Sequence, residues 1–209
     1  MMVLPLIAGR SSSNELFHID LALQPHLFVC YSEEEEFTGM MIEFCKQLMT
    51  NDEENVTFAL AIKSRNADAI IASVPERNIS RLYITNNQSI STEDSSRLFM
   101  KDIHKEFVKR NKISAKNKEG KTTNRNSKLI IFCDNILEVL IVNNKRNMNG
   151  SYFLEILQHG PAVGMHCIVA GSVSYRNLLR QLMNVKIRKE EAGIIHTIYS
   201  ARIGTYIVG

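Results

Sequence analysis

Features that would assign a function directly are missing from this sequence of 209 residues. No apolar run approaches the length of about 20 residues that a membrane-spanning helix needs. The N-terminal MMVLPLIAG is too short, and too interrupted by proline, for a signal peptide. The four cysteines lack a C-x-x-C spacing, and none of the six histidines lies at a metal-ligand spacing from Cys, Asp or Glu. We therefore predict no metal site and a reduced, cytosolic setting.

A strong charge bias and an internal repeat are also absent. The net charge of +3 is too small to indicate nucleic-acid binding by itself. Apolar residues make up 44% of the chain and charged residues 22%, which is typical of a globular protein. The length favours one α/β domain with ample chain for a core, so we expect residues 1–209 to form a single domain.

Apolar runs alternate with helical patterns along the chain. The expected strands are residues 3–8, 16–23, 27–30, 56–63, 82–85, 129–133, 166–170, 194–199 and 204–208. The expected helices are residues 33–49, a long helix that opens at Ser91 or Thr92, residues 151–158 and residues 178–185. Residues 69–74 form a further apolar run. Continuous apolar strands such as 129–133 are typical of parallel strands buried on both faces, so we predict a mostly parallel sheet flanked by helices.

The segment between the strand 27–30 and the helix 33–49 has the frame of a phosphate-binding loop. Such a loop follows the pattern G-x-x-x-x-G-K-[ST] between a strand and a helix. In that register the chain has Tyr31, Ser32, Glu33, Glu34, Glu35, Glu36, Phe37 and Thr38. Both glycines are absent, phenylalanine replaces the lysine, and only the last hydroxyl remains. Four carboxylates at this place would repel a triphosphate.

The same residues fit the start of an ordinary helix. Ser32 and Glu35 have the spacing of a capping box, with Ser32 as the N-cap. Acidic residues in a first turn also stabilise the helix dipole, so the helix would supply its own anion. On this segment alone, a strand–turn–helix unrelated to nucleotide loops remains an equal alternative.

Three ordered segments resemble the FtsK/SpoIIIE family of RecA-like P-loop ATPases. The phrase before the loop resembles the family's lead-in to its Walker A loop and contains Asp20, Leu21, Pro25, His26 and Leu27. The segment LIIFCDN resembles the Walker B strand, with Asp134 at the magnesium-linked aspartate and Asn135 at the catalytic glutamate. The segment GPAVGMHCIVAGS resembles the sensor strand. It keeps Gly160, Ala162, Gly164, His166 and Ala170, and it has Pro161 for an arginine and Ser172 for a glutamine.

This resemblance implies a RecA-like P-loop NTPase fold but not the activity. Phosphoryl transfer needs both a phosphate cradle and a group that activates the nucleophile. The loop 31–38 is then a vestigial Walker A motif, Asp134–Asn135 a vestigial Walker B motif and Ser172 a vestigial sensor. We expect no catalytic residue here, and we do not expect ATP or magnesium, the family's cofactors, to bind this domain.

Tandem FtsK-like modules, some of them degenerate, occur in the coupling ATPases of type VII secretion. The length of this chain resembles the last module of the EssC type. The resemblance implies a catalytically silent cytoplasmic domain of a membrane-anchored protein. Its implied partners are the adjacent FtsK-like module of the same chain, further copies in a homo-oligomer, and secreted helical substrates of the WXG type, but not nucleic acid.

Two other functions remain open from the residues. A conditional ATPase could borrow arginines from a neighbouring subunit, and Arg77, Arg81 and Arg176 are the candidates. A DNA translocase would use the basic stretch 109–128, which lacks interleaved aromatic residues for base stacking. A substrate surface could use methionines, which also suit a core; they are Met40, Met41, Met100 and Met148.

Overall fold

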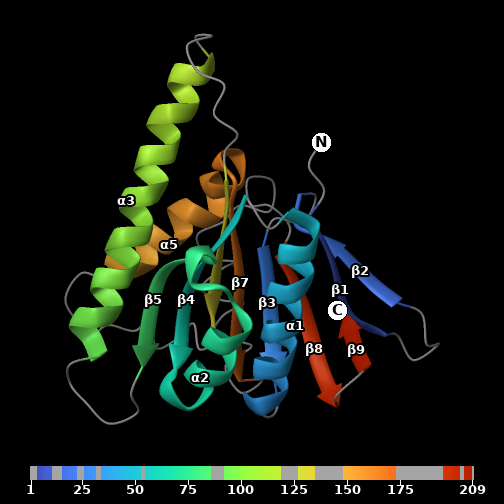
Figure 1. Cartoon of the computed structure of the whole chain (residues 1–209). Coiled ribbons are helices and arrows are strands. Elements are labelled where there is room, and N and C mark those ends of the chain that lie inside the picture. Colours follow the sequence, from blue (N-terminus) through green and yellow to red (C-terminus); the bar gives the residue numbers. More distant parts are fainter. Residues whose placement is uncertain are drawn as a thin grey trace.

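The structure is a computed structural model. It describes residues 4–10, 16–22, 26–31, 34–52, 55–85, 92–118, 127–134, 148–172, 195–202 and 205–208. The described strands form one sheet in the order β2-β1-β9-β8-β3-β7-β6-β4-β5 (Figure 1). All neighbouring pairs from β8 to β5 are parallel, whereas β1 with β2 and β8 with β9 are antiparallel. The predicted class, a mostly parallel α/β sheet, is confirmed.

The elements follow the expected order with shifted bounds. The strands are β1 (Pro5–Arg10), β2 (Leu16–Asp20), β3 (His26–Tyr31), β4 (Val56–Lys63), β5 (Ile79–Thr85), β6 (Lys128–Cys133), β7 (Met165–Ser172), β8 (Ile195–Arg202) and β9 (Thr205–Val208). The helices are α1 (Glu34–Asp52), α2 (Ser64–Ser73), α3 (Thr92–Lys118) and α5 (Met148–His159), with short 3-10 helices η1 (Glu76–Asn78) and η2 (Gly160–Val163). The expected helix 178–185 lies outside the described residues.

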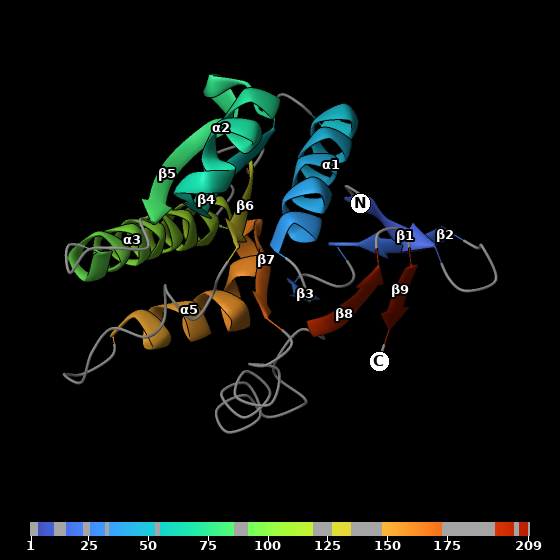
Figure 2. The same ribbon diagram turned by 90° about the horizontal axis from the view of Figure 1, so that it is seen from below.

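The sheet carries helices on both faces (Figure 2). Helices α1 and α2 cover one face, where Met41, Phe44 and Leu48 of α1 are buried. Helices α3 and α5 cover the other face, where Phe107 and Ile156 are buried. The central strands β4 and β6 are therefore buried on both sides, which explains why their sequences are continuously apolar. No helix among the described residues is both long enough and apolar enough to cross a membrane.

Two segments differ from the simplest expectation. The apolar run 69–74 belongs largely to α2, because the buried residues Ala67, Ile70 and Val74 recur at helical spacing. Helix α3 continues to Lys118, well into the basic stretch that begins at residue 109. Figure 1 shows this helix projecting beyond the sheet.

Candidate functional site

The positions that the resemblance assigns to the Walker A, Walker B and sensor motifs meet at the carboxyl edge of the parallel strands. Tyr31, the last residue of β3, pairs in register with Ser172, the last residue of β7. Strand β6 lies on the other side of β7 and ends at Cys133, directly before Asp134. Asn135 lies outside the described residues. Because parallel strands end at one edge, the fold brings together the described members of the three motifs, at the edge where open α/β sheets bind ligands.

The residues that align with a P-loop are mostly helix, in line with the helix expected over residues 33–49. Strand β3 extends to Tyr31, and α1 begins at Glu34. Residues 34–37, which the P-loop register assigns to the loop, form the first turn of α1. Thr38 follows in the helix and is half-buried. The backbone N–H of a fifth helical residue bonds within the helix, so the amide of Thr38 does not face the site. Ser32 and Glu33 lie outside the described residues, and the capping box therefore stays a prediction.

Asp134 is buried, with an exposed fraction of 2%. Its Oδ2 accepts a 2.6 Å hydrogen bond from the backbone N–H of Lys63 and a longer one, 3.5 Å, from Nδ2 of Asn66. Lys63 is the N-cap residue of α2, and its own side chain makes no capping hydrogen bond. The Asp134 carboxylate therefore binds the start of α2, where a helix dipole favours negative charge. Among the described residues, no cluster of three or more His, Cys, Asp and Glu could hold a metal ion.

His26, from the lead-in phrase, is a buried structural connector. Its Nδ1 accepts a 3.0 Å hydrogen bond from the backbone N–H of Cys167, and its Nε2 lies 3.0 Å from the carbonyl oxygen of Leu157. Since a backbone N–H only donates, Nδ1 is unprotonated and Nε2 carries the proton. Burial, followed by the nearby His166, lowers the pKa of His26 to about 3. The neutral ring thus joins β3 to β7 and to the last turns of α5.

The residues that match the sensor phrase also have structural roles. Gly164 has a φ of 73°, in the left-handed region that favours glycine. A Cβ on Gly160 would lie 3.2 Å from the carbonyl oxygen of Met165, closer than packed atoms allow without a shift. His166 and Ala170 are buried. In the lead-in phrase, Oδ1 of Asp20 accepts hydrogen bonds from the backbone N–H of Ala22, in the turn after β2, and from that of Leu4, before β1. Ala162, which also matches the phrase, is exposed, so structural roles explain most but not all of the described residues that agree with the family.

Solved structures share this fold. No family model and no curated protein matches the sequence. The cytoplasmic domain of the Thermomonospora curvata type VII secretion ATPase EccC matches 94% of this chain with a TM-score of 0.63 and 11% identity. ATPases 2 and 3 of the same EccC, in complex with a signal sequence peptide, match 96% with a TM-score of 0.63 and 14% identity. The cytoplasmic domain of EssC matches 98% with a TM-score of 0.60 and 14% identity.

This chain has the fold of the type VII secretion ATPase domains. It spans 22%, 34% and 37% of the lengths of those three chains, respectively. The P-loop NTPase fold expected from the three motifs is thereby confirmed. Identities of this size show the fold alone.

The other candidate residues that the structure describes lie in the core or at the opposite edge of the sheet. Met40, Met41 and Met100 are buried and belong to the core, which excludes them from an exposed substrate surface. The side chain of Met148 and all of Arg176 lie outside the described residues. Arg77 and Arg81 are exposed at the amino-terminal end of β5, the opposite edge of the sheet. They therefore do not reach the vestigial loop of their own subunit.

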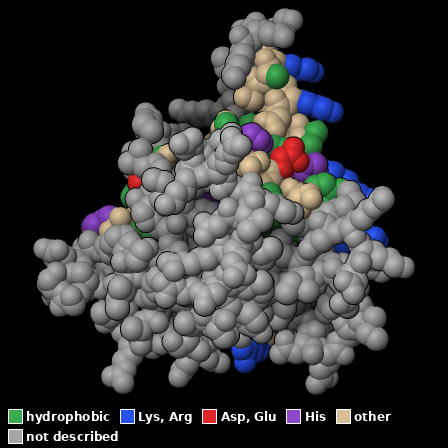
Figure 3. All heavy atoms as spheres, turned by 180° about the vertical axis from the view of Figure 1, so that it is seen from behind, with side chains coloured by type: hydrophobic (Ala, Val, Ile, Leu, Met, Phe, Trp, Pro, Cys, Tyr) green, Lys and Arg blue, Asp and Glu red, His purple; other side chains and the backbone are tan. Residues whose placement is uncertain are grey.

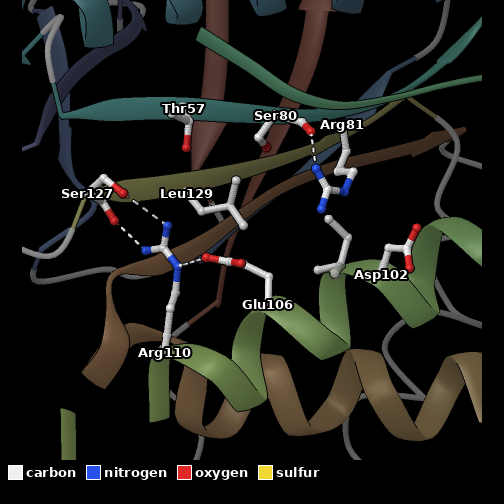
Figure 4. Close-up of a pocket in the computed structure, with 9 residues that line it drawn as sticks. Thr57, Ser80, Arg81, Asp102, Glu106, Arg110, Ser127 and Leu129 are labelled. Carbon is white, nitrogen blue, oxygen red and sulfur yellow. Dashed lines mark hydrogen bonds and ion pairs between the residues drawn. The ribbon is translucent and has the colours of Figure 1, made fainter. Parts of the chain in front are cut away.

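A pocket of about 220 Å³ lies at that opposite edge, between α3 and the starts of β4, β5 and β6 (Figure 4). The lining consists of hydroxyls, two acids, two arginines and two apolar side chains: Thr57, Ser80, Ser127, Asp102, Glu106, Arg81, Arg110, Ile103 and Leu129. Its charged groups are largely bonded to one another or to backbone. Arg81 donates to the carbonyl oxygen of Ser80, and Asp102 accepts a 2.8 Å bond from Lys105.

Arg110 holds one side of this pocket and was not distinguishable in the sequence from its basic neighbours. It is 8% exposed. Its guanidinium bonds Glu106 at 3.0 Å, the carbonyl oxygen of Val163 at 3.3 Å, and both the carbonyl and the hydroxyl of Ser127. It thus joins α3 to η2 and to the start of β6. The helical spacing of Ile103, Phe107 and Arg110 is the signal that could have indicated its burial.

Proposed function

We propose that this chain is a catalytically silent ATPase-like module of a type VII secretion coupling protein. Its role is to bind neighbouring modules and exported proteins rather than to hydrolyse ATP. The observation that best supports the lack of catalysis is that α1 already begins at Glu34, within residues 31–38, which align with a P-loop. A phosphate nest needs several successive N–H groups in a glycine-permitted loop, and here residues 34–37 are helical with three carboxylates among them.

The aspartate of the vestigial Walker B motif supports the same conclusion. Magnesium in P-loop enzymes is held by such an aspartate together with the loop hydroxyl. In this chain Asp134 uses Oδ2 for the N–H of Lys63, and Thr38 lies within α1. These residues do not fit a magnesium–ATP complex. We therefore infer that the site holds neither ATP nor magnesium.

The place of the module in secretion is supported by the shared fold. The similar chains are several times longer than the match, and one is described as containing ATPases 2 and 3. We propose that this module docks on an adjacent FtsK-like module of its own chain, in a homo-oligomer of a membrane-anchored protein. The EccC structure with a signal sequence peptide supports a further role in recognising exported proteins. We propose, from the resemblance stated above, that these are helical proteins of the WXG type.

Export by the cells that make this protein tests the role. Deleting the coding region of the module should abolish secretion of the type VII substrates while their intracellular amounts persist. Substituting Ser172→Ala, at the vestigial sensor, should leave secretion unchanged because no phosphate is sensed there. Normal export without the module would refute the proposed role.

An ATP hydrolysis assay on the purified chain tests separately whether the module is catalytically silent. Phosphate release from ATP should equal that of a buffer blank. If the purified oligomer hydrolyses ATP and loses this activity in an Arg77→Ala variant, the module is instead a conditional ATPase with an arginine supplied in trans.

A further inference from the structure

Five lysines of α3 form a row along one side of the helix. They are Lys101, Lys105, Lys109, Lys112 and Lys116. With 3.6 residues per turn, the positions i, i+4, i+8, i+11 and i+15 fall within an arc of about 80°, and the row is about 22 Å long. All five are exposed. In Figure 3, Lys and Arg side chains project along one side of this helix.

The row places like charges next to one another. Each neighbouring pair is spaced i,i+4 or i,i+3, and like charges at these spacings destabilise a helix. Only the first part of the row has acidic partners among the described residues. Lys105 bonds Asp102 at 2.8 Å, and Lys109 lies 3.8 Å from Glu106, which also bonds Arg110. The second part, at Lys112 and Lys116, has no ion pair with a described residue.

The core does not account for this part of the helix. Phe107 is the last buried apolar residue of α3, yet the helix continues to Lys118. Most of residues 111–118 with described side chains are exposed, and this half projects beyond the sheet (Figure 1). A projecting helix with a one-sided row of cations presents a regular surface to a partner.

We propose that this lysine row binds an acidic α-helix of a protein partner, one with carboxylates at the matching spacing. Within the row, the ammonium group of Lys105 bonds the carboxylate of Asp102 at this surface. The hydrogen bond from Lys105, aided by the charges of Arg81 and Lys101, lowers the pKa of Asp102. A straight row of lysines on one helix can pair with carboxylates on a second helix that lies alongside it, because both helices have the same rise per residue and so the same spacing between charges.

Other polyanions fit less well. The carboxylates of Asp102 and Glu106 lie beside the row and would repel the continuous charge of a nucleic-acid backbone or a lipid surface. The row contains no aromatic side chain for base stacking. Leu98, 55% exposed, is the one large apolar side chain exposed on the described part of α3, which is too little for membrane insertion. The inference rests on this charge geometry and does not depend on the proposed role in secretion.

Fluorescence anisotropy with labelled helical peptides tests the inference on the chain of 209 residues. The probe is an alanine-rich peptide of about 20 residues with glutamates at i, i+4, i+8, i+11 and i+15. Its isomer carries the same glutamates spread around the helix. We expect the aligned peptide to bind more tightly than the isomer, with an affinity that falls as salt is raised.

Charge-reversal variants locate the site. Lys112→Glu should weaken binding of the aligned peptide roughly fivefold or more. Lys46→Glu, the same change at an exposed position of α1, should leave it unaltered. The proposal is overturned if the isomer binds equally well, if Lys46→Glu weakens binding as much, or if the aligned peptide does not bind. Tighter, Lys112-dependent binding of duplex DNA or of phosphatidylserine vesicles would also overturn it, and would assign the row to phosphates.

Discussion

The backbone N–H of Lys63 donates a 2.6 Å hydrogen bond to Oδ2 of Asp134, across the carboxyl edge of the sheet. This bond joins the end of β4 and the start of α2 to the end of β6. Asp134, the aspartate of the segment that resembles a Walker B strand, therefore has a structural partner inside its own chain. This hydrogen bond gives Asp134 a structural role that needs no nucleotide, which accounts for an aspartate here in a chain without the P-loop lysine and glycines.

Replacing Asp134 with alanine should destabilise the fold. The variant leaves the N–H of Lys63 without this acceptor in a partly buried place, and such a loss costs about 1–3 kcal/mol of unfolding free energy. Urea denaturation followed by circular dichroism measures the change. The control is Asp102→Ala, an exposed carboxylate of α3, which should stay within about 0.5 kcal/mol of the wild type. Equal effects of the two substitutions would contradict the structural role of Asp134.

His26 should make the protein less stable in acid. Its pKa is about 3 in the folded state against 6.5 for the free side chain. Between those values the unfolded chain takes up a proton that the folded chain does not bind. The contribution of His26 to stability is therefore complete above pH 6.5 and is lost as the pH falls toward 3, at up to about 1.4 kcal/mol per pH unit.

The matching variant is His26→Gln, which cannot titrate. Its unfolding free energy should be lower than that of the wild type at neutral pH. Between pH 6 and 4 its unfolding free energy should also change less with pH, because unfolding of the variant takes up one proton fewer than unfolding of the wild type. Denaturation curves at several pH values give both slopes. Identical slopes would show that the ring of His26 titrates alike in the folded and unfolded chains.

Two glycines should respond in opposite directions to alanine. Gly164→Ala forces a side chain into the left-handed region at a φ of 73°, at a cost of about 1–2 kcal/mol. Gly39→Ala lies in α1 with no atom within 4 Å of the added Cβ, and it should stabilise the protein by up to about 1 kcal/mol. Thermal denaturation of both variants checks the signs. A stabilising Gly164→Ala would contradict the backbone conformation described here.

Arg110 should tolerate no replacement by lysine. Lysine cannot reproduce the planar fork that serves Glu106, Ser127 and Val163 together. We expect Arg110→Lys to cost about 1–3 kcal/mol, because buried carbonyl groups lose their donors. The neighbouring exposed Lys109→Ala serves as the control and should change stability by less than about 0.5 kcal/mol. If Arg110→Lys leaves the unfolding free energy in urea unchanged, the hydrogen bonds of Arg110 do not contribute to the stability of the fold.

The parallel sheet was predictable because buried strands such as β6 leave a continuous apolar signal. The meeting of Tyr31, Ser172 and Asp134 at one edge followed from the same parallel order. The start of α1 at Glu34 was within reach of sequence reasoning, since acidic residues favour a first helical turn.

Two features could not be predicted from sequence patterns. The bond between Lys63 and Asp134 joins residues 71 positions apart, and nothing local in either segment specifies it. The burial of Arg110 was hidden by the surrounding lysines, because its partners Ser127 and Val163 come from distant segments. Contacts of this kind depend on how the strands and helices pack, which composition and periodicity do not contain.

Isothermal titration of magnesium–ATP into the purified chain tests the central claim, that the nucleotide site is occupied by the protein's own helix and hydrogen bonds. We predict no binding heat above dilution at nucleotide concentrations up to ~1 mM. The Asp134→Asn variant should give the same flat titration, because we propose that no magnesium binds at that position. Saturable binding with a dissociation constant near ~1 μM, weakened by Asp134→Asn, would contradict the claim.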